Sequence, residues 1–240
     1  MKKILIIGKR GFIGNNLAKY LKKFYNVKHI GFKNLNEFKK KINNFDYVVN
    51  TSTNKNYIYN KYDQRFDNDL KISNLIVNNH VIYSFLSTRK VYVSKANLKE
   101  NDKLAPKSNY SKNKLITEKK LTKKFKKNLI ILRVSNIIGE RNLTKKIHHT
   151  FIDIFFENIK NNFVIDNGND FKDFLSIDKF CQILKEIIRK KLTGIYNISI
   201  GQKVYLDDLI GWLNKFNNKK YKIKRNVNLK KDSFYLNNRK

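Results

Sequence analysis

The chain has 240 residues, of which 41% are hydrophobic and 13% aromatic, enough for one large or two small domains with a substantial core. This composition excludes a chain that is disordered throughout. The single cysteine, Cys181, excludes an intrachain disulfide and a cysteine-rich zinc site, and no apolar run approaches the ~20 residues that cross a bilayer. We expect a cytoplasmic protein without a membrane span or a metal site, in which His148 and His149 are surface residues.

The charge of the chain is strongly one-sided. Lys and Arg total 52 against 19 Asp and Glu, and the resulting net charge of +33 suggests a polyanionic partner. However, 44 of the cations are Lys and only 8 are Arg, whereas surfaces that grip phosphates also use the bidentate guanidinium of Arg. Lys and the 35 Asn are residues of A/T-rich codons, and the Lys are scattered along the whole chain. We interpret most of the charge as coding bias and expect no specific nucleic-acid partner.

Apolar runs and helical stripes alternate along the first half of the chain. In chain order the pattern predicts a strand at 3–7, a helix at 15–25, strands at 27–32 and 47–49 with a short helix at 35–42 between them, a helix at 66–77, a strand at 80–86, a helix at 111–125 and a strand at 129–132. Strands that alternate with helices in this way indicate βαβ units and a parallel sheet. No linker rich in Gly, Pro or Ser divides the chain.

Three glycines, Gly8, Gly11 and Gly14, follow the first strand and precede the first helix. This spacing in this context is typical of a dinucleotide-binding turn, because the glycines permit a tight turn, a close approach of the pyrophosphate and close packing of the helix. The helix N-terminus then faces the phosphates. The alternative is a plain strand-to-helix turn. The residues expected to contact the cofactor are Gly8, Arg10, Gly11, Phe12, Ile13, Gly14, Lys33, Thr51, Tyr110 and Lys114.

The end of the second strand lacks the acidic residue that would accept a hydrogen bond from a ribose 2′-hydroxyl. Arg10 and Lys33 stand where they would meet a 2′-phosphate instead, which favours NADP over NAD. The alternative is that Lys33 is one more lysine in a lysine-rich chain.

Tyr110 and Lys114 form a Y-x-x-x-K pair at the start of a predicted helix, so both lie on one helix face. The charge of Lys114 then favours the ionised phenol of Tyr110, which suits proton exchange. Thr88 ends an apolar strand, and the carboxyl ends of parallel strands are where ligands bind. Thr88, Tyr110 and Lys114 are therefore the candidate catalytic residues.

Six segments occur in the order found in extended short-chain dehydrogenases/reductases of the nucleotide-sugar epimerase/dehydratase family, which the chain resembles over almost its whole length. They are Gly8–Gly14, Ser87–Tyr92, Glu100–Glu118, Leu132–Gly139, Lys172–Asp178 and Gly194–Ile198. The resemblance implies a single α/β domain over 1–240, a Rossmann-like doubly wound parallel sheet. Residues 1–136 are then mainly the dinucleotide-binding core, and 137–240 mainly a small interleaved substrate lobe with returning core strands.

The resemblance also implies a chemistry on a nucleotide-diphosphate sugar. The nicotinamide would pass a hydride to or from sugar C4, Tyr110 would exchange the hydroxyl proton and Thr88 would orient that oxygen. Lys114 would hold the ribose, while Asn136 and Lys172 would meet the sugar nucleotide.

Two departures from the family pattern reduce the number of activities that we expect for this chain. Family dehydratases carry Asp-Glu directly after the catalytic Thr, where this chain has Arg89 and Lys90, so dehydration is disfavoured. The segment before Tyr47 is short, as if one strand-helix unit were trimmed. We therefore expect a 4-keto-sugar reductase. A 4-epimerase that recycles NAD, and a non-catalytic protein that binds a nucleotide or polyanion, remain open, as does a homodimer.

Overall fold

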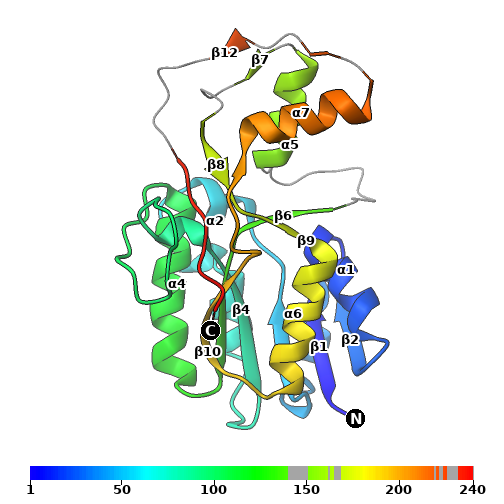
Figure 1. Cartoon of the computed structure of the whole chain (residues 1–240). Coiled ribbons are helices and arrows are strands. Elements are labelled where there is room, and N and C mark those ends of the chain that lie inside the picture. The colour runs from blue at the N-terminus through cyan, green and yellow to red at the C-terminus, as the bar shows by residue number, and fades with distance from the viewer. Residues whose placement is uncertain are drawn as a thin grey trace.

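The structure is a computed structural model that describes residues 1–139, 151–161, 169–218, 220–221 and 232–239, with the backbone alone of 163–164 and 224–225. His148 and His149 lie outside the described residues. A parallel sheet with helices forms the larger body, and a lobe that contains α5 and α7 lies beyond one end of it (Figure 1). None of the described helices is long and apolar enough to cross a membrane.

The central sheet has six strands in the order β10-β5-β4-β3-β1-β2, and every neighbouring pair is parallel. The strands are β1 (Lys3–Ile7), β2 (Asn26–Ile30), β3 (Tyr47–Asn50), β4 (Ile82–Thr88), β5 (Leu129–Val134) and β10 (Gly194–Ile198). This confirms the expected Rossmann-like sheet. The chain runs outward from β1 to β2 on one side and through β3, β4 and β5 on the other, so a topological switch point lies between β1 and β3.

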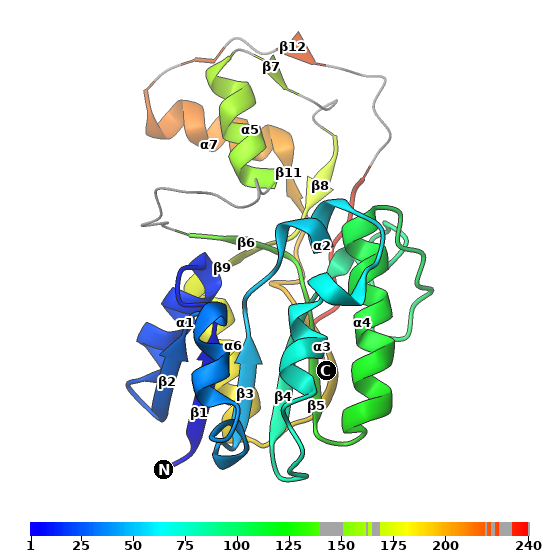
Figure 2. The same ribbon diagram turned by 180° about the vertical axis from the view of Figure 1, so that it is seen from behind.

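Helices cover both faces of this sheet, which explains why its strands are continuous apolar runs (Figures 1 and 2). Ile4 and Ile6 point into a core shared with α1 (Phe12–Leu21) and α6 (Ile177–Arg189). Leu5 and Ile7, one residue out of step, point into a core beneath α3 (Asn68–Ser73) and α4 (Asn109–Phe125). The two cores pack against opposite faces of the sheet and hold its strands in place.

The connection from β2 to β3 differs from the expected helix at 35–42. Two 3-10 helices, η1 (Phe32–Phe38) and η2 (Ile42–Asn44), take its place, and residues 31–46 contain no further strand. The apolar positions are still used, because Leu35 and Ile42 are buried in the core beneath α3. A segment this short crosses the sheet in tight turns rather than as a regular helix. The connection from β2 to β3 thus holds neither a further strand nor an α-helix.

The helix predicted at 66–77 is also shorter than expected. It is preceded by α2 (Lys55–Tyr59) and the 3-10 helix η3 (Gln64–Phe66), and it ends at Ser73. Its start is fixed by Asp67, whose carboxylate accepts a hydrogen bond from Leu70 N at 3.0 Å and one from Thr117 Oγ1 in α4 at 2.6 Å. This buried carboxylate thus joins α3 to α4.

The lobe beyond the carboxyl ends of the strands has its own core of Phe155, Ile159, Leu206 and Ile210. It consists of α5 (Phe151–Lys160), β7 (Phe163–Val164), β8 (Phe171–Lys172), β11 (Val204–Tyr205), α7 (Leu206–Phe216) and β12 (Lys224–Arg225). The short strands β6 (Asn136–Ile138) and β9 (Phe174–Ser176) pair with each other where the chain passes between sheet and lobe.

The last described segment, 232–239, returns from the lobe to the larger body (Figure 1). Phe234 and Leu236 are fully buried beside Val91 and Leu98. This return places the end of the chain against the 3-10 helix η4 (Arg89–Val91), which directly follows Thr88.

Candidate active site

The glycine turn is shaped by close contacts with Thr51, at the end of β3. A Cβ on Gly8, which has a φ of +125°, would lie 2.2 Å from Thr51 Oγ1, and one on Gly14 would lie 2.4 Å from the same atom. Thr51 Oγ1 itself donates a hydrogen bond to Ile7 O at 2.8 Å. Gly11 is the N-cap of α1, and no side chain caps this helix there. Strand, turn and helix therefore leave a bare backbone cradle suited to a pyrophosphate.

A hollow of about 500 Å³ opens beside this cradle. Its wall includes Gly8, Arg10 and Gly11 from the turn and Lys33 from η1, together with Thr51. None of the described residues that line it is acidic. The structure thus brings Arg10 and Lys33 to the same hollow, as the cofactor prediction requires.

A second hollow of about 270 Å³ adjoins the first, and residues 51–53 line both. It lies at the carboxyl ends of the strands, below the lobe. The predicted site residues that line it are Phe12, Ile13, Thr51, Thr88, Tyr110, Lys114 and Asn136. Residues far apart in the sequence are therefore gathered around two adjoining hollows near the switch point of the sheet.

The three candidate catalytic residues are held by local structure. Thr88 ends β4, and its Oγ1 accepts a hydrogen bond from Lys90 N at 3.3 Å. Tyr110 lies in the first turn of α4, where Ser108 and Ser111 form a capping box. Lys114 follows one turn later, with its Nζ 6.0 Å from the centre of the Tyr110 ring. The helix start fixes the phenol, and the helix period fixes the ammonium beside it.

Lys114 is buried and pairs with a carboxylate that the sequence analysis missed. Its Nζ lies 3.8 Å from Asp69 Oδ2, and both side chains are 5% exposed. Asp69 also accepts hydrogen bonds from Asn50 Nδ2 and Tyr83 OH, each at 2.8 Å. Burial raises the pKa of Asp69 to about 6, against the opposing effect of Lys114. The signal available in the sequence was a pair of acids, Asp67 and Asp69, in a chain with few of them.

Arg89 and Lys90, the two residues after Thr88, point to different places. Arg89 is buried, lies 3.6 Å from the ring centre of Phe234 and binds Asp232 through two hydrogen bonds. Burial raises the pKa of Asp232, but the hydrogen bonds and charge of Arg89 outweigh this and hold it far below its usual value. Lys90 lines the second hollow. Its pKa is lowered by burial and by the neighbouring Arg89.

Of the two residues expected to meet the sugar nucleotide, the structure places one in the hollow. Asn136 lines it, and its Nδ2 donates to Asp173 O at 3.3 Å. Lys172 lines neither hollow. Its Nζ donates to Asp232 O at 2.6 Å and lies 5.4 Å from the ring centre of Phe151, a residue of the hollow's wall. Lys172 therefore lies behind the wall, tied to the returning segment.

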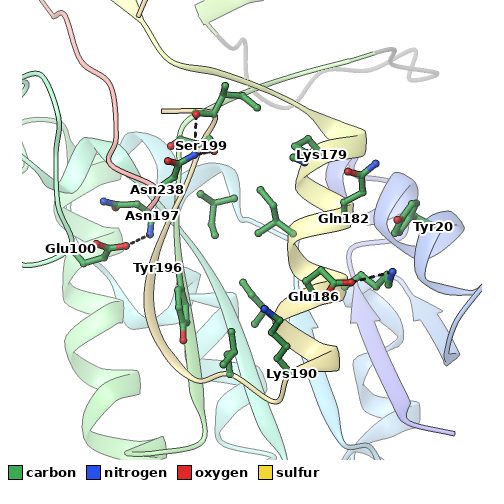
Figure 3. Close-up of a pocket in the computed structure, with 16 residues that line it drawn as sticks. Tyr20, Glu100, Lys179, Gln182, Glu186, Lys190, Tyr196, Asn197, Ser199 and Asn238 are labelled. Atoms are coloured by element: carbon green, nitrogen blue, oxygen red, sulfur yellow. Dashed lines mark hydrogen bonds and ion pairs between the residues drawn. The ribbon is translucent and has the colours of Figure 1, made fainter. Parts of the chain in front are cut away.

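A third and larger hollow, of about 750 Å³, lies between α6 and the edge strand β10 (Figure 3). Its wall includes Lys179 and Glu186 from α6, Lys190 directly after that helix, and Tyr196 from β10. It runs along the side of the sheet, not at the carboxyl ends of the strands, and none of the predicted site residues lines it. Volume alone therefore does not mark the site in this fold.

Comparison with known proteins agrees with this geometry. Residues 4–199 match the family model described as the NAD dependent epimerase/dehydratase family. The chain belongs to this family. It is 28% identical to the dTDP-D-glucose 4,6-dehydratase of Dictyostelium discoideum over an alignment with a length of 254. This alignment covers 82% of this chain and 58% of that protein. The chain thus spans less than two thirds of the length of this relative.

Solved structures of family members share the fold of the chain. The UDP-N-acetylglucosamine 4-epimerase of Methanobrevibacter ruminantium superposes with a TM-score of 0.79 at 19% identity, covering 99% of this chain and 90% of that one. The dTDP-4-dehydrorhamnose reductase of Clostridium acetobutylicum gives 0.75 at 17% identity, covering 98% and 89%. These likenesses show the fold, which epimerases and reductases share.

Proposed function

We propose that this chain is an NAD(P)-dependent oxidoreductase that reduces the 4-keto group of a nucleotide-diphosphate sugar. The observation that carries the proposal is the shared wall at residues 51–53. It places the hollow at the glycine turn directly beside the hollow lined by Thr88, Tyr110 and Lys114. A dinucleotide laid along the first hollow would reach the second with its nicotinamide end. The glycine turn supports such a ligand, because the N-terminus of α1 lines the first hollow at Gly11 without a side-chain cap.

In the proposed reaction the bound dinucleotide supplies the hydride, and the protein handles the proton and the oxygen at C4. Thr88 donates a hydrogen bond to that oxygen and fixes its position. Tyr110 transfers its phenolic proton to the oxygen as charge develops there. Lys114 favours the resulting phenolate by its charge, and its pairing with Asp69 holds the ammonium in place. Phe12, Ile13 and Phe151 give the hollow apolar walls that limit the access of water.

The cofactor hollow supports NADP as the preferred dinucleotide. Arg10 and Lys33 line it, and its described wall has no carboxylate to bind a ribose 2′-hydroxyl. A charged contact to a 2′-phosphate contributes ~1.5–3 kcal/mol, so NADPH is expected to bind about tenfold tighter than NADH, or more. Fluorescence titration of both dinucleotides measures this directly, and equal affinities would refute the preference.

The pair Arg89 and Lys90 argues against dehydration, the activity in the name of the Dictyostelium relative. Elimination of water needs a base near the sugar, and an arginine stays protonated in proteins. Arg89 is moreover buried in its ion pair with Asp232, away from the hollow. Lys90 is the member of this pair that lines the described hollow, and it supplies no carboxylate there.

The proposal is tested with protein loaded with reduced dinucleotide. The absorbance of the reduced nicotinamide is followed after a 4-keto-6-deoxy sugar nucleotide is added. A reductase oxidises the cofactor in proportion to the sugar consumed. A 4-epimerase instead interconverts C4 epimers of a sugar nucleotide with no net change in the cofactor. A chain that binds neither dinucleotide contradicts both activities and favours the non-catalytic alternative.

A further inference from the structure

The cationic side chains around the second hollow differ in whether a carboxylate pairs with them. Lys114 has Asp69 as its counter-ion, and Arg89 has Asp232. None of the described residues that line this hollow is acidic, although two of them, Lys90 and Lys114, are lysines. Lys90 therefore gives the hollow a net positive charge that its described wall does not balance.

Lys90 is held beside the reacting position by the backbone. Its amide donates to Thr88 Oγ1 at 3.3 Å, so the start of its side chain is fixed relative to the proposed contact with C4. Asp232 is the acidic residue whose charge acts on Lys90, but Arg89 and Ser94 already bond its two carboxylate oxygens. No ion pair to the Lys90 ammonium is formed by any residue within the described part of the chain. Lys90 is an exposed residue in the wall of the hollow.

We propose that Lys90 binds a carboxylate carried by the sugar ring of the substrate, so that the enzyme selects acidic over neutral nucleotide sugars. This inference rests on the proposed function and names the substrate class for the same site. Lys90 forms no ion pair with the described residues, and an anionic ligand group that enters the hollow supplies the missing counter-charge. Lys90 is adjacent to Thr88, which contacts the oxygen at C4, and ring substituents lie within one side-chain length of that oxygen.

The diphosphate of the nucleotide is the other anion that a lysine in this hollow would attract. The position beside Thr88 favours the sugar, because Thr88 marks the reacting carbon and the diphosphate is attached at the far side of the ring. The two sources make different predictions for a nucleoside diphosphate without sugar. Only a contact to the diphosphate would make its binding depend on Lys90.

The test is calorimetric binding to the NADP-saturated protein, with matched acidic and neutral ligands on three nucleotides. The ligand pairs are UDP-glucuronic acid and UDP-glucose, dTDP-glucuronic acid and dTDP-glucose, and GDP-mannuronic acid and GDP-mannose, with each free nucleoside diphosphate beside its pair. In at least one pair the acidic sugar is expected to bind about tenfold tighter than the neutral one. Lys90→Gln should abolish this preference without weakening the neutral sugar or the free diphosphate.

Lys112→Gln is the matched control, because it removes the same charge from an exposed position on α4 that lines none of the hollows. It should keep the preference, and unchanged NADP binding by Lys90→Gln shows that this variant is folded. The proposal is overturned if no pair shows an acidic preference, if Lys112→Gln lowers it equally, or if Lys90→Gln weakens free diphosphates as much as acidic sugars. Equal binding of acidic and neutral sugars by a protein that still binds NADP overturns this inference alone, whereas a chain that binds no dinucleotide overturns the proposed function as well.

Discussion

Arg89 grips both carboxylate oxygens of Asp232, a residue 143 positions further along the chain, at 3.0 and 2.5 Å. The guanidinium also lies 3.6 Å from the centre of the Phe234 ring. This contact ties the end of the described chain to the turn that follows Thr88. Arg89, which directly follows Thr88, thus holds the returning segment 232–239 against this turn.

The variant Arg89→Met tests how much this ion pair contributes to stability, because it keeps apolar bulk against Phe234 but removes the charge. We expect the free energy of unfolding to fall by ~1–3 kcal/mol, because two hydrogen bonds between charged groups are lost from a largely buried guanidinium. Arg65→Met is the control, since Arg65 pairs with Asp63 but its side chain is 84% exposed, and solvent screens such a pair so that its loss should change stability little. Urea denaturation of both variants measures the difference, and equal losses would contradict the assignment.

The role of Tyr110 predicts a selective loss in Tyr110→Phe. Turnover should fall by ~10²–10⁴-fold, because the proton donor is removed while the ring that lines the hollow stays. Dinucleotide affinity should change little. Tyr59→Phe, at an exposed tyrosine of α2, should keep full turnover. Turnover of Tyr110→Phe near the wild-type level would show that another group supplies the proton.

The glycine cradle predicts opposite effects for two helical glycines. An alanine methyl at Gly14 would meet Thr51 Oγ1 at 2.4 Å and Gly8 O at 2.5 Å, so α1 must shift and destabilise the protein by ~1–3 kcal/mol. Dinucleotide binding should be lost with it. Gly211→Ala in α7 meets nothing within 4 Å and should stabilise the helix by up to ~1 kcal/mol. Thermal shift with and without dinucleotide checks both, and a Gly14→Ala protein that still binds would refute the cradle.

Asp69 predicts a pH dependence of stability. Its pKa is raised from 3.8 to about 6 by burial, so the folded state binds this proton more tightly than the unfolded state. The stabilisation from this group is therefore complete below about pH 4 and is lost as the pH rises towards 6, with a slope of at most ~1.4 kcal/mol per pH unit.

Comparison of the wild type with Asp69→Asn isolates this effect, because all other titrating groups are shared. The free energy of unfolding of the wild type, relative to the variant, should decrease between about pH 4 and pH 6. Denaturant titrations at a series of pH values provide the measurement. A difference that stays constant or increases over this range would contradict the raised pKa.

Local sequence patterns predicted the features that depend on local structure. The apolar run Ile4–Ile7, the glycine turn and the capped start of α4 are fixed by their own residues, so the sheet and the gathering of Thr88, Tyr110 and Lys114 follow from them. The α-helix predicted at 35–42 was wrong. The apolar spacing of this segment suits an α-helix, whereas its short span between β2 and β3 imposes 3-10 turns.

Contacts between distant segments were not predictable in the same way. The pairing of Asp69 with Lys114 depends on how α3 packs against α4, and a helical pattern does not encode that packing. Lys172 was expected at the substrate, but the return of the chain from the lobe brings Asp232 to it instead. The returning segment also brings Asp232 to Arg89, whereas Lys90, its neighbour in the sequence, lines the second hollow.

The most direct test of the account is a single-turnover measurement of hydride transfer. The protein is saturated with NADPH deuterated at the transferred position and mixed with a panel of neutral and acidic 4-keto sugar nucleotides. The account predicts stoichiometric loss of the reduced-nicotinamide absorbance, with deuterium found at C4 of the product, and no transfer in Tyr110→Phe. Tight binding of NADPH and of the sugar nucleotide without any transfer of deuterium to C4 would contradict it.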